Sequence, residues 1–306
     1  MNLKLGGMNY EVVPESFAQN IWISKGKTLI IGYDVAHPGK PSRDELMNKM
    51  PPQKPSVVGF SFNGSMHGEK FIGDYHYQTP RCEQVIEDEL QAMKQACEEF
   101  GRLHGKDPWV PRFTVAVTTK RHNARFFTRN NGIGNPKPGT VVDTDVVRND
   151  LTEFYMQSHH PVQIYASGGG GSFVDGGTTR ADAIGFRARP RSVLAKKRFT
   201  GTAKPTAYQI LIDENDMSMD QVQALMLALT FHHQISDAPV SLPEPTYQAD
   251  EWAKRGKNIW NAYMLRHNPI TMECAGDYAT PPIDFDAMTN RLAFWKTELE
   301  HLRVNA

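Results

Sequence analysis

The stretch TLIIGYDVAHP, residues 28–38, decides the fold of this chain. Its first half is apolar or small and it ends in a His-Pro pair, which is the pattern of a buried β-strand that stops at a turn. Asp34 stands at the end of this strand. An aspartate in this position either begins a turn or binds a metal ion, and the rest of the chain has to separate these interpretations.

The segments after residue 38 alternate between the two periods of regular structure. Strands are predicted at 56–64, 68–78, 112–119 and 205–214, and helices at 82–105, 218–236 and 246–266. The polar, proline-rich stretch 39–55 is predicted to be a loop. This order of strands and helices predicts an α/β fold with a mixed sheet flanked by helices.

Length and composition narrow the class of protein. The 306 residues suit one large domain or two smaller ones, and 34 basic residues balance 34 acidic ones, so a polyanion would have to bind a local patch. Three cysteines without a C-x-x-C spacing fit a reducing compartment. Neither a secretory leader nor an apolar run of ~20 residues is visible. We therefore expect a cytoplasmic or nuclear protein without a membrane partner.

Residues 160–200 differ in composition from the rest of the chain. They contain four consecutive glycines, another glycine pair and then a run of Arg and Lys, without an amphipathic period. Glycine runs cannot recover their ordering entropy through burial. We therefore predict a disordered insertion at about 160–200.

Three carboxylates stand where a metal site would need them. Asp34 follows a strand, Glu83 opens the helix after the third strand, and Asp250 lies early in the last predicted helix. Two-metal nucleases bring such carboxylates together from distant parts of the chain. Acids are also common in the first turn of a helix, so each residue alone has an ordinary structural explanation.

Two stretches carry basic residues in a pattern that suits RNA. TTKRHNARFFTRN, residues 118–130, interleaves aromatic residues with basic ones that include Lys120, Arg121 and Arg125. This pattern suits a nucleic-acid backbone with stacked bases, and a solvated hairpin can share it. ADEWAKRGK, residues 249–257, adds basic residues that either bind phosphate or cover a solvated helix face.

Taken together, the motifs resemble the Piwi domain of the Argonaute family. They occur in family order over most of residues 2–159 and 201–257, as NLKLGG, IIGYDVAHP, PSVVGFSF, TTKRHNARFF, GTVVDTDV, EFYMQSH, GTAKPTAYQILID and VSLPEPTY. The resemblance implies an RNase H-like fold that binds a small guide RNA. In active members it also implies cleavage of the paired target RNA with a divalent metal such as Mg²⁺. Piwi domains of the family also bind Trp-containing silencing cofactors.

The resemblance assigns roles to individual residues. Asp34 and Asp250 match metal ligands, and Glu83 matches the glutamate that completes the catalytic set. Positions that match guide contacts are Lys4 and Arg255 at the 5′-phosphate, and Lys120, Arg125, His159, Ser241 and Tyr247 along the backbone. Ile235 stands where the family often has a phosphate-binding arginine.

Three departures from the family pattern affect these assignments. GDYHYQTPR runs directly into CEQVIEDELQAMKQA, so a block with one core strand and one catalytic aspartate is absent. We predict that residues 112–118 take its place and pair with 28–35. The insertion at about 160–200 is the second departure. The third is that the resemblance begins at Asn2, which makes 1–27 the end of the Mid/Piwi junction and 28–306 the Piwi domain.

The leading hypothesis is an Argonaute-like Piwi protein of small-RNA silencing that binds RNA without slicing. The first alternative is a Mg²⁺-dependent, guide-directed endoribonuclease, in which another group replaces the absent aspartate. The second is a module that docks silencing partners without binding RNA, and the third is a chain that does not fold stably.

Overall fold

The computed structural model describes residues 2–3, 7–12, 28–40, 43–47, 54–63, 70–80, 89–106, 108–129, 133–161, 163–165, 198–267 and 283–300. The chain divides into two compact units, which are treated separately below. Unit 1 comprises residues 1–113, 214–237 and 242–306, and unit 2 comprises residues 114–213 and 238–241.

Unit 1 contains a three-stranded antiparallel sheet. Its strands are β1 (Ile31–Ala36), β2 (Ser56–Phe62) and β3 (Ile72–Gln78), in that order. The register places Asp34 opposite Gly59. The helices of unit 1 are α2 (Arg43–Met47), α3 (Leu90–Leu103), α4 (Met219–Thr230), α5 (Glu244–His267) and α6 (Phe285–Leu292).

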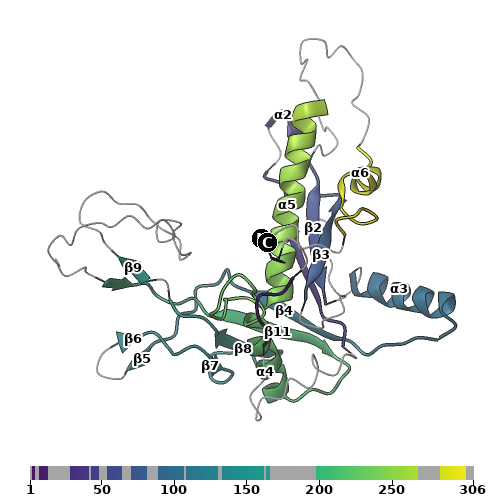
Figure 1. Cartoon of the computed structure of the whole chain (residues 1–306). Helices are drawn as coiled ribbons and strands as arrows, with labels where there is room; N and C mark the ends of the chain where they lie inside the picture. The colour runs from purple at the N-terminus through teal and green to yellow at the C-terminus, as the bar shows by residue number, and fades with distance from the viewer. Residues whose placement is uncertain are drawn as a thin grey trace. The chain divides into compact units, whose positions relative to one another are not determined.

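Helix α5 lies along the sheet of unit 1, as Figure 1 shows. Two glycines make this close packing possible. A Cβ added to Gly32 would come within 2.0 Å of the carbonyl oxygen of Pro245, and one added to Gly59 would come equally close to that of Ala249. Because the helix backbone rests directly on the strands at these points, only glycine fits there.

Aromatic side chains form the core between α5 and the sheet. Trp252, Tyr75 and Tyr77 are fully buried, and Val57 and Trp260 complete the cluster. The buried hydroxyl groups are satisfied: that of Tyr77 donates to the carbonyl oxygen of Gly256 at 2.8 Å. An aromatic residue buries about 150–250 Å², worth roughly 4–6 kcal/mol each as an upper estimate. This cluster therefore holds α5, and with it Asp250, against the sheet.

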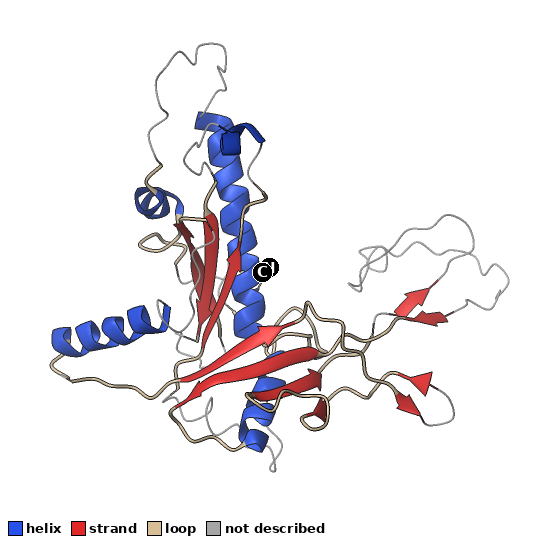
Figure 2. Ribbon diagram, turned by 180° about the vertical axis from the view of Figure 1, so that it is seen from behind, coloured by secondary structure: helices blue, strands red, loops and turns tan. Residues whose placement is uncertain are grey.

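Unit 2 is built on a four-stranded antiparallel sheet, drawn in red in Figure 2. Its order is β4 (Thr114–Thr119), β11 (Thr206–Asp213), β8 (Thr152–Gln157) and β7 (Thr140–Val142). Two short ladders accompany it, β5 (Thr128–Arg129) with β6 (Ile133–Gly134), and β9 (Gln163–Tyr165) with β10 (Arg198–Thr200). Phe154 of β8 is paired with Tyr208 of β11, and their fully buried rings stack with centroids 4.8 Å apart.

The predicted pairing of residues 112–118 with 28–35 is wrong. Among the described residues β4 pairs with β11, whereas β1 pairs with β2, and the two strands belong to different sheets. Alternation in β4 fits one partner as well as another, and the eight-residue β11 offers it a long antiparallel ladder. Strand β1 is consequently an edge of its sheet in the part of the chain that the structure describes.

The structure also corrects several boundaries. Both ends of the predicted disordered insertion are strands, β9 and β10, and the residues between them lie outside the described part. The helix predicted to reach residue 236 ends at Thr230, and the loop predicted at 39–55 contains the short helix α2. Helix α6 was not predicted. Within the described residues, no helix has the length and apolar character that would let it cross a membrane.

Candidate nucleic-acid interface

Three predicted RNA contacts come together at one edge of the unit 2 sheet. The register pairs Thr119 at the end of β4 with Ala207, and Met156 near the end of β8 with Thr206. The ends of β4 and β8 therefore meet at the start of β11. Lys120 directly follows β4, and His159 follows β8 after one residue, so the topology brings them to the same edge.

The segment 238–241 is fastened to this edge and supplies the third residue, Ser241. The hydroxyl of Thr206 donates to the carbonyl oxygen of Ser241 at 2.5 Å, and that of Ser158 donates to Val240 at 2.7 Å. Lys120 Nζ donates to Ser241 Oγ at 2.5 Å. The exposed ammonium group of Lys120 and a hydroxyl are thereby held side by side, an arrangement suited to phosphate oxygens.

The surroundings of His159 favour an anion. Burial, with the charges of Lys120 and His160, lowers the pKa of His159 to about 4. Its Nδ1 is buried and has no hydrogen-bond partner among the described residues. The neutral ring is thus held in a positive field that a phosphate group would relieve. An anion bound here would gain from Lys120 and raise the pKa of His159.

The basic stretch after β4 is less open than the sequence suggested. Arg125 Nη1 donates to the carbonyl oxygens of His122 and Ala124, at 3.1 and 2.5 Å, so this guanidinium nitrogen holds the local backbone. Phe126 packs edge-on against Tyr155. Arg121 and Phe127 are exposed. With Arg129, which is also exposed, the stretch therefore offers separate exposed cations and one exposed ring instead of a continuous stacking surface.

In unit 1 the sheet register brings Asp34 and Asp250 to the same level. Asp34 is paired with Gly59, and Gly59 lies under the carbonyl group of Ala249, the residue before Asp250. Asp34 also lies on the same face of β1 as Gly32, which faces α5. That the two carboxylates approach each other stays a prediction. Glu83 lies outside the described residues.

The carboxylate of Asp250 already forms an ion pair within the chain. Lys254, one turn later on α5, donates to Asp250 Oδ2 at 2.6 Å and to Glu251 Oε1 at 3.0 Å. Partial burial opposes the charge of Lys254, but the bonds to Asp250 and Glu251 outweigh it and raise its pKa. The described residues contain no group of three or more His, Cys, Asp or Glu that could hold a metal ion. They do not fit the two-metal site implied by the resemblance.

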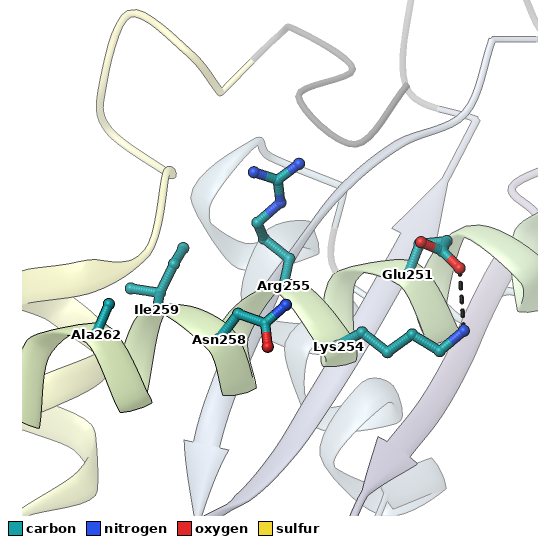
Figure 3. Close-up of a pocket in the computed structure, with 6 residues that line it drawn as sticks. All are labelled: Glu251, Lys254, Arg255, Asn258, Ile259 and Ala262. Carbon is teal, nitrogen blue, oxygen red and sulfur yellow. Dashed lines mark hydrogen bonds and ion pairs between the residues drawn. The ribbon is translucent and has the colours of Figure 1, made fainter. Parts of the chain in front are cut away.

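The side chain of Lys254 also points away from that of Arg255, the predicted phosphate ligand. Figure 3 shows the two side chains leaving α5 in different directions, with Lys254 turned back to Glu251. Arg255 lines a shallow cavity of about 380 Å³ along α5, together with Asn258, Ile259 and others. Lys254 and Arg255 therefore do not add their positive charges at one place, as the sequence had suggested. Lys4, the other predicted 5′-phosphate contact, lies outside the described residues.

Tyr247 belongs to a buried polar cluster that the sequence did not reveal. Its ring packs on His233, with centroids 4.5 Å apart. His233 Nδ1 lies 2.8 Å from Glu244 Oε2, and Gln248 Nε2 donates to Glu244 Oε1 at 2.9 Å. Glu244 is fully buried, so removing one partner would leave a buried carboxyl oxygen without its hydrogen bond, which is costly. The i, i+4 spacing of Glu244 and Gln248 was readable from the sequence, whereas the contact with His233 was not. Ile235 is exposed.

Comparison with known proteins identifies this arrangement. A model of the Piwi domain family matches residues 80–167 and 173–261, more than half of the chain. Argonaute protein wago-1 of Caenorhabditis elegans is 25% identical over 345 residues, which cover 100% of this chain and 31% of that protein. Protein argonaute 15 of Oryza sativa subsp. japonica is 26% identical over 325 residues, covering 92% and 31%. The chain thus spans less than a third of the length of these relatives.

Solved structures agree in fold. The C-terminal lobe of a budding yeast Argonaute superposes with a TM-score of 0.64 at 21% identity, over 89% of this chain and 55% of that one. Kluyveromyces polysporus Argonaute with a guide RNA gives 0.62 at 21% identity, over 87% and 32%. The fold is therefore α/β and RNase H-like. The chain belongs to the Piwi domain family of the Argonaute proteins.

Proposed function

We propose that this protein binds a small guide RNA in gene silencing, pairs it with a target RNA and does not cut the target. The observation that carries the proposal is the meeting of Lys120, His159 and Ser241 at one sheet edge in unit 2. Such an RNA-binding role would place the protein in the cytoplasm or the nucleus.

The sheet edge would contact the phosphate backbone and not the bases. Lys120 and the hydroxyl of Ser241 are hydrogen-bonded to each other at this edge, and neither group distinguishes one base from another. Small-RNA silencing needs binding that is independent of base identity, because the guide, not the protein, specifies the target sequence. Arg255, whose planar fork holds two phosphate oxygens, would add a separate anchor for the 5′-phosphate.

The ion pair of Asp250 supports the proposed absence of slicing. Its carboxylate is paired with Lys254 inside the same helix, so a metal ion would have to displace an ammonium group at 2.6 Å. The chain also lacks the block that carries another catalytic aspartate in the family. With fewer free carboxylates, the two-ion stabilisation of the attacking and leaving oxygens would be lost.

RNA binding is tested by titration of single-stranded RNA over a salt series. Lys120→Ala should weaken binding and reduce the slope of log K against log salt by about 0.7, the value for one phosphate contact. Lys137→Ala, which removes an exposed lysine of the same unit, is the matched control and should leave the slope unchanged. Equal effects of both variants would contradict a defined contact at the sheet edge.

The 5′-phosphate anchor is tested with RNAs that differ only in a 5′-phosphate or 5′-hydroxyl. We expect wild type to prefer the phosphate and Arg255→Ala to lose that preference. Affinity should stay near the ~10⁻⁴–10⁻⁶ M of non-specific association, since the described residues offer few phosphate contacts. No binding of either RNA would favour a module that docks partner proteins, including Trp-containing silencing cofactors.

Slicing is tested by incubating the protein with a guide–target duplex and Mg²⁺ or Mn²⁺. We expect no site-specific cut. Cleavage that disappears in Asp34→Ala would overturn the proposal and establish the endoribonuclease alternative with Asp34, Glu83 and Asp250.

A further inference from the structure

The four-stranded sheet of unit 2 has two outer strands that differ in how they are protected from other chains. Strand β7 is three residues long, Pro138 stands two residues before it and Asp143 directly follows it. A short strand flanked by a proline and a charge is poorly suited to pair with another chain. Strand β4 has six residues, none of them charged or proline, and all are partly exposed. The sheet is therefore protected at β7 and not at β4.

Strand β4 has β11 as its one strand neighbour among the described residues. An outer strand points the N–H and C=O groups of every second residue away from its neighbour. The irregularity in this ladder lies between Ile210 and Ile212 of β11, so the bulge is not in β4. The side of β4 opposite β11, which we call the open side of β4, thus presents a regular row of backbone groups to a further strand.

The sequence of β4 is complementary to itself in an antiparallel pairing. Its first five residues read Thr-Val-Ala-Val-Thr, the same in both directions. A second copy related by a two-fold axis at Ala116 would place Thr114 opposite Thr118 of the other copy. Val115 would then lie opposite Val117. Such pairs of threonines and of β-branched residues are favourable across strands, and no like charges face each other within β4. The strand is therefore matched to a second copy of itself.

We propose that two copies of this chain associate through the open side of β4 and join their four-stranded sheets into one continuous antiparallel sheet. The contact is isologous, because each copy contributes the same residues to it. The axis at Ala116 suits either orientation of its backbone, since hydrogen-bonded and non-hydrogen-bonded antiparallel pairs can both lie on a two-fold axis. The proposal concerns self-association and does not depend on RNA binding.

Cations at the two ends of β4 give the association a distinctive salt dependence. Lys120 directly follows the strand, Arg112 stands two residues before it, and both are exposed. Antiparallel pairing would bring Lys120 of each copy near Arg112 of the other. Salt screens this repulsion, so the dimer should become tighter as the salt concentration rises. RNA binding should instead become weaker.

The first test is disulfide trapping in the full 306-residue chain. Ala116→Cys would place two thiols on the axis, where facing Cα atoms lie about 4.5–5.5 Å apart, within the range for a disulfide. Thr118→Cys is the matched control on the same face of β4. Its two copies would be four residues apart along the strands, about 13 Å, which is too far for a disulfide. Under mild oxidation we expect a covalent dimer from Ala116→Cys alone, with peptide mapping that places the bond at the introduced cysteine.

The second test reverses one charge at a fixed pair of positions. Thr114→Lys combined with Thr118→Lys opposes two lysines in both cross-strand pairs, whereas Thr114→Lys combined with Thr118→Glu opposes a lysine and a glutamate. In sedimentation equilibrium we expect the second variant to dimerise at least about tenfold more tightly, because two pairs change from repulsion to attraction. Circular dichroism and thermal melting of both variants check that the fold is kept.

Three results would overturn the proposal. They are a wild-type chain that stays monomeric at about 100 µM, a concentration at which weak complexes form, equal trapping of Ala116→Cys and Thr118→Cys, and equal dissociation constants of the two folded charge variants. A wild-type dimer that weakens as salt increases would also contradict it, because that dependence indicates ion pairs and not opposed cations at the strand ends.

Discussion

Gly59 provides the sharpest test of how the carboxylate region of unit 1 is built. An added Cβ would lie 2.0 Å from the carbonyl oxygen of Ala249 and 2.5 Å from the N–H of Ala253. Both atoms belong to the backbone of α5, so no side chain can move aside. Because ordinary contacts begin at 3.4 Å, Gly59→Ala must push the helix off the sheet by about 1.4 Å.

This displacement has two energetic parts. Overpacking a tight core by one methyl group costs typically about 1–3 kcal/mol. Withdrawal of α5 also loosens the packing around Trp252, which is buried to 1% exposure in the wild type. We therefore expect Gly59→Ala to lower the free energy of unfolding by about 3–4 kcal/mol, equivalent to a fall in Tm of about 10 °C.

The assay is thermal and urea unfolding followed by circular dichroism. Gly39→Ala is the matched control, because its added Cβ would meet no atom within 4 Å, and it should stay within about 0.5 kcal/mol of the wild type. If Gly59→Ala were as stable as Gly39→Ala, α5 would not rest on β2 through backbone contact, and the argument that Asp250 lies level with Asp34 would lose its basis.

Three further predictions concern pH and helix capping. The lowered pKa of His159 should cost about 2 kcal/mol of stability as pH falls from 6.5 to 4, allowing for partial exposure, and His159→Gln should flatten this profile. Burial raises the pKa of Asp74 to about 6. The protonated Asp74 should therefore stabilise the fold below pH 4, and about 3 kcal/mol of the free energy of unfolding should be lost as pH rises through 6. Asp74→Asn should remove this loss in a series of melting curves. Ser218→Ala should cost about 1 kcal/mol in urea unfolding, because Ser218 and Gln221 form a reciprocal capping box. Unchanged pH profiles in the first two variants, or an unchanged urea midpoint in the third, would contradict these assignments.

The sequence by itself predicted the elements whose cause is local. Alternation and terminal turns gave strands near 31–36, 56–62 and 72–78, and the serine before the helix at residue 219 predicted its N-terminus correctly. The family was also readable, since its motifs are short and keep their order. The pairing of Asp250 with Lys254 follows from i, i+4 spacing and was available from the sequence.

The tertiary structure decided which distant segments meet. Alternation in β4 reveals which residues share a face, but it does not choose β11 over β1 as the partner, because backbone hydrogen bonds are the same for any strand. The hydrogen bond from Tyr75 to Leu292 likewise requires α6 to return to the edge strand β3. Local propensity acts over a few residues, whereas these contacts depend on how whole elements pack against one another. The strands and helices were therefore a property of the sequence, and the sites between them a property of packing.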